Sequence, residues 1–345
     1  MRTAIAVGIV ATLLGTAVIT GQSAAPAPTG AIVGTGVFTV FVENMDRSLA
    51  FYHDAFGMDV PALPSSGGRP YNPANPRLFA MFDIPGARER HQSARVAGTG
   101  VAVEVMDIQD VDHTIVDLRL QDPGTATLVL IVRDVNSMLD RVVHSGAAVV
   151  TTGGKPVTLA DGGRAVLVRD VDNRFIEIVQ PASTASAAVD ASRDVLDMSV
   201  SIAVNDLNQA VHVYRDVLGF DVKGGDGFSA DQASRMLTGL PKVESRRAQA
   251  RANGSKLSLE FVEYRGADRR PLKFKIQDRG AARLQLRAQN IDAVVDRVKS
   301  AGLKVVSDGA VAVPIPPNLK GALVADADNF FLTLFEACDN CAPRR

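Results

Sequence analysis

Two glutamates interrupt short apolar stretches of this 345-residue chain. Glu104 lies in the run 101–106, and Glu260 lies in the run 257–262, at an offset of 156 residues. Side chains of a strand alternate between its two faces, so each carboxylate shares a face with its second neighbours in the run. A charge is rare in such a run unless that face borders a cavity or a partner. The pattern therefore predicts acidic groups that line pockets.

A third glutamate has similar surroundings. Glu177 lies in the expected strand 174–179, between the apolar pairs Phe175–Ile176 and Ile178–Val179. Burial raises the pKa of a carboxyl group, which suits a group that gives and takes protons near neutral pH. Glu104 and Glu177 are therefore the candidate catalytic residues. The simpler alternative is that each of them pairs with a basic group.

The strands and helices that would carry these residues occur twice in the sequence. The helix ends 51–58 and 213–220 match each other, and many single residues match at the offset of 156. Such pairs are Pro85 and Pro241, Arg95 and Arg251, Glu104 and Glu260, Gly146 and Gly302, Asp170 and Asp326, Asn173 and Asn329, and Phe175 and Phe331. Self-similarity at one spacing indicates a duplicated supersecondary structure. Each half contains two strand–helix–strands units, so we predict four βαβββ units.

Composition divides the rest of the chain. Residues 1–24 combine a positive end, an apolar run and small residues, as an export signal does, and an uncleaved membrane anchor is the alternative. The further segments are a linker at 25–34, a first module at 35–182, a linker at 183–196, a second module at 197–337 and a tail at 338–345. Cys338 and Cys341 are expected to form a disulfide, because exported proteins meet an oxidising compartment. We therefore expect a periplasmic or secreted protein without membrane contact after signal cleavage.

The charge balance bears on the class of partner. The formal net charge is −1 at pH 7 and 22% of the residues are charged, which differs from the basic stripe typical of nucleic-acid-binding proteins. Local basic pairs such as Arg246–Arg247 are expected to be solvated. We expect a small-molecule ligand, no nucleic acid, and either a monomer or a homodimer.

Two motifs resemble those of one family. Residues 51–58 and 213–220 are similar to the FYxdxLGf helix end of the vicinal oxygen chelate (VOC) superfamily, and residues 170–177 are similar to its DPdGnxxEl ending. This superfamily includes glyoxalase I, bleomycin-resistance proteins and extradiol dioxygenases. The resemblance spans residues 35–337. It implies an α+β fold in which four βαβββ units pair into two tandem cup-shaped modules of mixed sheet, with the ligand inside and the helices outside.

The resemblance also implies where a metal would bind. Metal-using members take ligands from four positions of each cup, commonly His on the opening strands and Glu on the last strands. These positions fall on Val37, Glu104, Thr127 and Glu177 in the first cup, and on Ser199, Glu260, Arg283 and Thr333 in the second. Because two carboxylates alone make a poor zinc or nickel site, we expect no cofactor, and a metal-dependent glyoxalase or an extradiol dioxygenase is disfavoured. An all-oxygen Mg or Mn site at Glu104 and Glu177 is the alternative.

Arg283 is implied to face Glu260 in the second cup. The preferred interpretation is a buried ion pair that fixes the geometry of the cup. The alternative is an anion site, in which Arg283 and Arg287 bind a ligand carboxylate or phosphate.

The other inner positions predict a mostly apolar pocket for a small organic ligand. The expected ligand contacts are Val37, Thr39, Phe41, Met106, Thr127 and Phe175 in the first cup, and Glu260, Arg283 and Arg287 in the second. Two functions stay open. One is metal-free binding of a small molecule, as in bleomycin-resistance proteins. The other is a lyase or isomerase of the glyoxalase type, in which Glu104 and Glu177 move a proton.

Overall fold

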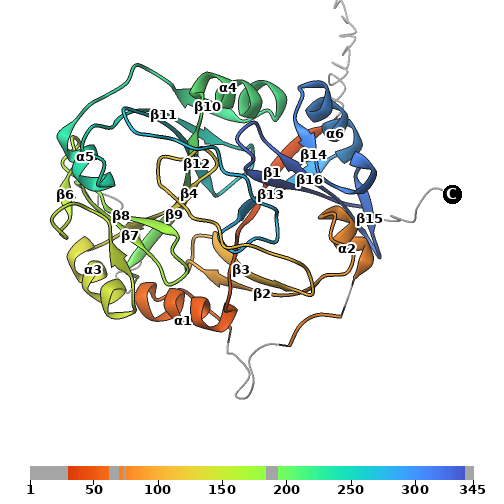
Figure 1. Cartoon of the computed structure of the whole chain (residues 1–345), viewed down its shortest axis with the longest axis horizontal. Coiled ribbons are helices and arrows are strands. Elements are labelled where there is room, and N and C mark those ends of the chain that lie inside the picture. Colours follow the sequence, from red (N-terminus) through yellow and green to blue (C-terminus); the bar gives the residue numbers. More distant parts are fainter. Residues whose placement is uncertain (1–29, 62–69, 74, 184–192, 339–345) are drawn as a thin grey trace, which may run out of the picture.

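The computed structural model contains two mixed β-sheets with helices on their outer faces (Figure 1). It describes residues 30–61, 70–73, 75–183 and 193–338. The expected export signal, most of the expected linker at 183–196, and Cys341 lie outside the described residues. Within the described part of the chain, no helix is long and apolar enough to cross a membrane.

The first sheet joins strands from both ends of the chain. Its order is β14–β16–β17–β13–β1–β3–β2, and β15 pairs with β16. The strands are β1 (Ala31–Phe41), β2 (Arg88–Arg95), β3 (Ala102–Gln109), β13 (Ala282–Gln289), β14 (Lys304–Val305), β15 (Val313–Ile315), β16 (Leu319–Ala325) and β17 (Phe331–Ala337). β1 runs antiparallel to β13 and parallel to β3, so the opening strands of the first and fourth units meet in the middle of this sheet.

The second sheet is formed by the central part of the sequence. Its order is β10–β11–β12–β9–β4–β8–β7–β5, and β6 pairs with β7. The strands are β4 (Ala126–Val132), β5 (Ala148–Val149), β6 (Val157–Thr158), β7 (Arg164–Arg169), β8 (Phe175–Gln180), β9 (Val195–Val204), β10 (Asp221–Gly224), β11 (Glu244–Arg251) and β12 (Ser258–Arg265). Here the opening strands β4 and β9 pair antiparallel.

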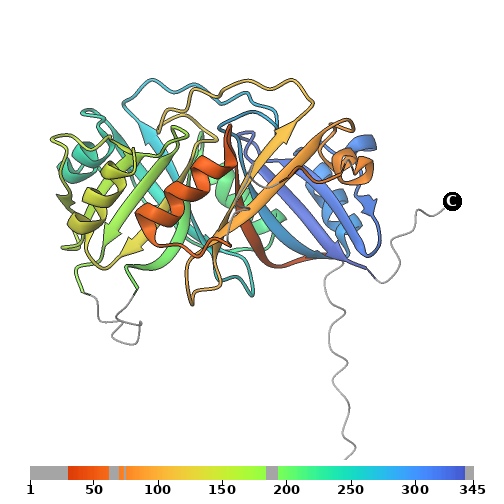
Figure 2. The ribbon, with the colours of Figure 1, turned by 90° about the horizontal axis from the view of Figure 1, so that it is seen from below.

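The four units therefore pair first with fourth and second with third. The predicted βαβββ units and mixed sheets are confirmed, but the expectation that each half of the sequence forms its own cup is wrong. Each unit offers the same kind of open strand edge, and backbone pairing can join any two such edges. We call the sheet of the first and fourth units the 1–4 cup, and that of the second and third units the 2–3 cup. The two lie side by side (Figure 2).

Helices cover the convex faces, and two short helices reach the cups. The helices are α1 (Met45–Phe56), α2 (Pro76–Met81), α3 (Val135–His144), α4 (Leu207–Val211) with a π-helical turn (His212–Val217), α5 (Gln232–Thr238), α6 (Ile291–Ser300) and a 3-10 turn (Asp308–Ala310). Asn44, Asp134 and Asp206 cap α1, α3 and α4, since their side-chain oxygens accept first-turn backbone amides.

Two apolar clusters correspond to the two faces of the strands. Val101, Val103 and Val105 belong to the cluster that includes the buried helix residues, whereas Met106 belongs to a second cluster formed by residues inside the cups. The alternation predicted around Glu104 is therefore confirmed, and this carboxylate points to the concave side.

The helices α2 and α5 help to fill the cups. Phe79 and Met81 of α2, and Leu237 of α5, belong to the inner cluster. α2 contacts β15 and β16 of the 1–4 cup, and α5 contacts β6 and β7 of the 2–3 cup. A Cβ atom at Gly321 would collide with the Met81 sulfur, so a larger residue here would force the Met81 side chain to move. Each cup is thereby closed over part of its concave face.

Two tyrosine–aspartate pairs attach helical segments to strand turns. Tyr52 of α1 donates to Asp170 Oδ2 at 3.3 Å, and Tyr214 donates to Asp326 Oδ2 at 3.0 Å. Each carboxylate also accepts two backbone amides of its own turn. Burial raises the pKa of Asp170 to about 6 and the pKa of Asp326 to about 7. Because Tyr52 belongs to the first unit and Asp170 to the second, their bond links the two cups.

Candidate functional site

An ion pair lies at the centre of the 1–4 cup. Arg283 Nη2 donates to Glu104 Oε2 at 3.3 Å, and the two residues are 2% and 8% exposed. The same oxygen accepts a hydrogen bond from Thr39 Oγ1 at 2.8 Å and one from Gln285 Nε2 at 3.1 Å. Three protein donors therefore engage Glu104, which leaves it little capacity to act on a ligand.

Aromatic rings enclose the guanidinium of Arg283. Its carbon lies 4.7 Å from the ring centre of Phe82 and 5.7 Å from that of Phe41, within cation–π range. Arg283 Nη1 also donates to Thr333 Oγ1 at 3.2 Å. Burial lowers the pKa of Arg283, and Glu104 opposes that shift. The surroundings fix the guanidinium as part of the cup wall.

The 2–3 cup holds a more open ion pair. Arg247 Nη1 donates to Glu260 Oε1 at 2.6 Å, and Ser201 Oγ donates to the same oxygen at 3.2 Å. The Arg247 and Glu260 side chains are 33% and 23% exposed, compared with 3% and 11% for Arg283 and Glu104. This pair is therefore accessible to solvent, whereas the pair of the 1–4 cup is buried.

Glu177 lies beside that pair without a protein partner. Among the described residues its side chain forms no hydrogen bond and no ion pair. Burial raises the pKa of Glu177, while nearby Arg247 opposes this shift and Glu260 adds to it. Tyr264 is buried close by, and burial, partly opposed by Arg247, raises its pKa to about 12. The cup thus combines an ion-paired carboxylate with a carboxyl group that takes up a proton more readily than usual.

The concave face of the 2–3 cup is closed at one end and accessible at the other. The buried inner positions are Thr127, Phe175, Ser201, Val262 and Tyr264, next to Leu237 of α5. The half-buried inner positions are Val129, Ile131, Glu177, Val179, Ser199, Ser258 and Glu260. Glu177 and Glu260 therefore lie on the accessible part, among small and branched apolar side chains.

A family model described as Glyoxalase/Bleomycin resistance protein/Dioxygenase superfamily matches residues 34–178 and 198–309. The chain belongs to this superfamily. The two matched regions also support the internal repeat.

Solved structures of this superfamily share the fold. Glyoxalase I from Zea mays is 15% identical, with a TM-score of 0.55 over 89% of this chain and 92% of its own. A mutant of that enzyme is 14% identical, with a TM-score of 0.55 over 89% of this chain and 94% of its own. At such identities the likeness shows the fold alone. No curated protein sequence matches the chain.

The superfamily fold distributes the expected contact residues over both cups. Val37, Thr39, Phe41, Met106, Arg283 and Arg287 lie on strands of the 1–4 cup, with Glu104. Thr127, Phe175 and Glu260 lie on strands of the 2–3 cup, with Glu177. The expectation that Glu104 and Glu177 share one cup is therefore wrong, and so is the expectation that Arg283 faces Glu260. Both errors follow from the pairing of the units.

Sequence reasoning missed Arg247, which was expected to be solvated. Arg246 and Arg247 are adjacent in β11, so their side chains point to opposite faces of the sheet. The guanidinium of Arg246 pairs with Glu263 on the face opposite to Glu260. Strand alternation could have separated the two arginines. The repeat offers a second signal, because Arg247 stands 156 residues after His91, which lies at the rim of the 1–4 cup with Nδ1 2.7 Å from Glu89 Oε2.

The side chains in the two cups do not match the His and Glu ligand sets of metal-using superfamily members. In the 1–4 cup, the guanidinium of Arg283 pairs with Glu104. In the 2–3 cup, Glu177 and Glu260 lie beside the guanidinium of Arg247. No group of three or more His, Cys, Asp and Glu side chains in the described part of the chain could hold a metal ion. Glu104 and Glu177 belong to different sheets, so the alternative of one divalent ion between them in a single cup is not supported.

Proposed function

We propose that this protein binds a small organic molecule in the 2–3 cup, without a metal ion. The observation that carries the proposal is Glu177, a half-buried carboxyl group on a concave face that has no partner among the described residues. The carboxyl group is engaged by no other side chain among the described residues, so its hydrogen-bonding capacity is available to a ligand. We further propose that the mature protein acts outside the cytoplasm, as the segment 1–24 predicts.

The surroundings of Glu177 support a ligand with both apolar and polar parts. Val129, Ile131 and Val179 offer apolar surface on the half-buried part of the cup. Glu177, when protonated, donates to a ligand carbonyl, and Arg247 donates to a second oxygen. Small α-hydroxyketones and α-hydroxy acids have this arrangement of oxygens.

One observation favours proton transfer as the alternative function. The raised pKa of Glu177 brings it closer to neutral pH, where a general acid or base is most effective. The partner carboxylate is then Glu260 of the same cup, in place of Glu104. In this alternative the protein is a lyase or isomerase that moves a proton next to a carbonyl group.

NMR with acetoin, an α-hydroxyketone, and mandelate, an α-hydroxy acid, tests the proposal. Saturation-transfer signals should appear with the intact protein, and Glu177→Met, which removes the donor, should weaken them, while Glu43→Met, a change at an exposed control position, should not. Loss of binding alone supports a binding protein. Exchange of the acetoin α-proton in D2O that disappears in Glu177→Gln supports the enzyme. Absence of binding by both probes contradicts the proposal for this ligand class.

A further inference from the structure

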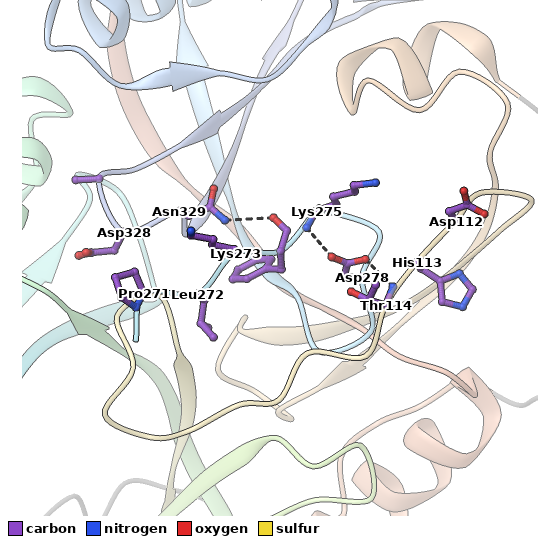
Figure 3. Close-up of a pocket in the computed structure, with 12 residues that line it drawn as sticks. Asp112, His113, Thr114, Pro271, Leu272, Lys273, Lys275, Asp278, Asp328 and Asn329 are labelled. Carbon is purple, nitrogen blue, oxygen red and sulfur yellow. Dashed lines mark hydrogen bonds between the residues drawn. The ribbon is translucent and has the colours of Figure 1, made fainter. Parts of the chain in front are cut away.

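A cavity lies among the loops beside the cups, and its floor residues Leu272 and Phe274 belong to the inner apolar cluster. The cavity has a volume of ≈ 640 Å³ and is formed by the loop after β3, the loop before β13 and the turn between β16 and β17 (Figure 3). This volume is typical of small-molecule sites. We propose that the cleft binds a small organic anion, whose apolar part lies on Leu272 and Phe274 and whose charged group is held by Lys273 and Lys275.

The floor of the cleft is apolar and well supported. Leu272 and Phe274 are each 8% exposed, so they present a part of their surface to the cavity. The Phe274 ring packs edge-to-face on Phe331, with 5.3 Å between ring centres and 82° between planes. Asn329 Nδ2 donates to the Phe274 carbonyl at 3.2 Å (Figure 3). These contacts hold Phe274 in place before any ligand arrives, which lowers the entropic cost of binding.

Two lysines stand on the open side of the same segment. Leu272, Phe274 and Ile276 are buried while Lys273 and Lys275 are exposed, as expected for an extended segment with alternating side chains. Neither ammonium group forms an ion pair with a described residue. Both charges are therefore available to a ligand.

The buried carboxylates of the cleft are engaged by the protein backbone. Asp278 accepts the amide of Thr114 at 2.8 Å and the amide of Lys275 at 2.7 Å. Asp328 accepts the amide of Asn205 at 3.1 Å. These acids hold the loops together, and Asp112 is an exposed carboxylate at the rim. Asp112, Asp278 and Asp328 therefore line the cleft together with the two lysines, and an anion must bind at the lysine side, away from these carboxylates.

The internal repeat supplies a comparison within the same molecule. The related cleft, which includes residues 115–116 and 171–173, has a volume of only ≈ 210 Å³. At the offset of 156, Arg119 takes the place of Lys275, and it is bonded to Asp122 at 2.7 Å and to Asp268 at 3.1 Å. The residue that corresponds to Lys275 is thus neutralised within the protein, and it does not line the smaller cleft.

A second difference enlarges the proposed site. Arg47 pairs with Asp172 at 2.7 Å and lines the smaller cleft. In the second half of the sequence, Gln209 stands in place of Arg47 and Asp328 in place of Asp172. The larger cleft therefore lacks this arginine, whose side chain would occupy part of its volume.

The absence of tryptophan from the chain permits a site-specific test. Thr114→Trp places a single fluorophore on the rim of the cleft, and the variant is titrated with phenyl phosphate, benzoate and benzyl alcohol. We expect a saturable change of emission with one or both anions and none with the alcohol. Adding Lys273→Ala and Lys275→Ala should raise the dissociation constant at least tenfold. As a control, Lys155→Ala with Lys299→Ala removes the same number of positive charges elsewhere on the surface. This pair of changes should leave the dissociation constant unchanged.

The absence of a response to all three compounds would overturn the proposal. A response to benzyl alcohol equal to that of the anions would mean that only apolar contact occurs. Equal weakening by both lysine pairs would mean unspecific charge attraction. If Thr114→Trp fails to fold, Ala327→Trp reports from another wall of the same cleft. The preference between phenyl phosphate and benzoate identifies the anionic group, and Glu177→Met should not change binding here, so this site and the 2–3 cup are tested separately.

Discussion

Arg283 and Glu104 form a buried ion pair across 3.3 Å, although 179 residues separate them in the sequence. They come from the fourth and first units, so the pair can form only because these two units share one sheet. Its counterpart in the other cup, Arg247 with Glu260, lies within the third unit and beside Glu177 of the second. The two cups therefore differ in chemistry, one closed by its ion pair and the other with a free carboxyl group.

Glu104→Gln should destabilise the fold by about 3–5 kcal/mol, because it leaves the Arg283 charge buried without a counter-ion. The free energy of unfolding in urea measures this effect. Combining it with Arg283→Met should recover at least half of the loss, since an apolar residue needs no partner. Glu43→Gln breaks the more exposed pair with Arg279 and should cost about 1 kcal/mol or less. A similar small loss for Glu104→Gln would contradict a structural role for the 1–4 pair.

Asp326 should make the protein less stable as the pH rises. Its pKa is about 7 when folded and 3.8 in the reference state, so the folded protein binds the extra proton. The stability that this proton contributes is full below pH 3.8 and is lost as the pH rises through 7. Asp326→Asn mimics the protonated form and should flatten the decline of unfolding free energy between pH 4 and 7. Asp268→Asn, which changes an exposed carboxylate, should not, and a steeper decline in Asp326→Asn would refute this assignment.

The pairing of the units predicts how half of the chain behaves. A fragment of residues 30–183 contains β1 and β4 but lacks β13 and β9, which cover their edges. Two copies can cover these edges for each other, so we expect a dimer. Light scattering after size-exclusion chromatography measures its mass. A folded monomeric fragment would show that each half closes its own cup.

The sequence allowed the units and the strand faces to be predicted, but not the partners of each unit. The alternation of Val103, Glu104 and Val105 placed the carboxylate on the concave face correctly. The repeat located four equivalent units, yet equivalent units have equivalent strand edges, and backbone hydrogen bonds can join any two such edges. Arg247 was missed for a related reason, because adjacent arginines resemble a solvated surface until the strand separates them onto two faces.

The pKa of Glu177 tests the central claim most directly. Carboxyl 13C chemical shifts, followed against pH in the full-length protein, should give a value above the ordinary 4.5. Arg247→Met should raise it further, because the guanidinium stabilises the ionised form, whereas Arg246→Met, on the other face of the strand, should have little effect. A pKa at or below 4.5, unchanged by Arg247→Met, would contradict the assembly of Glu177, Arg247 and Glu260 in one cup.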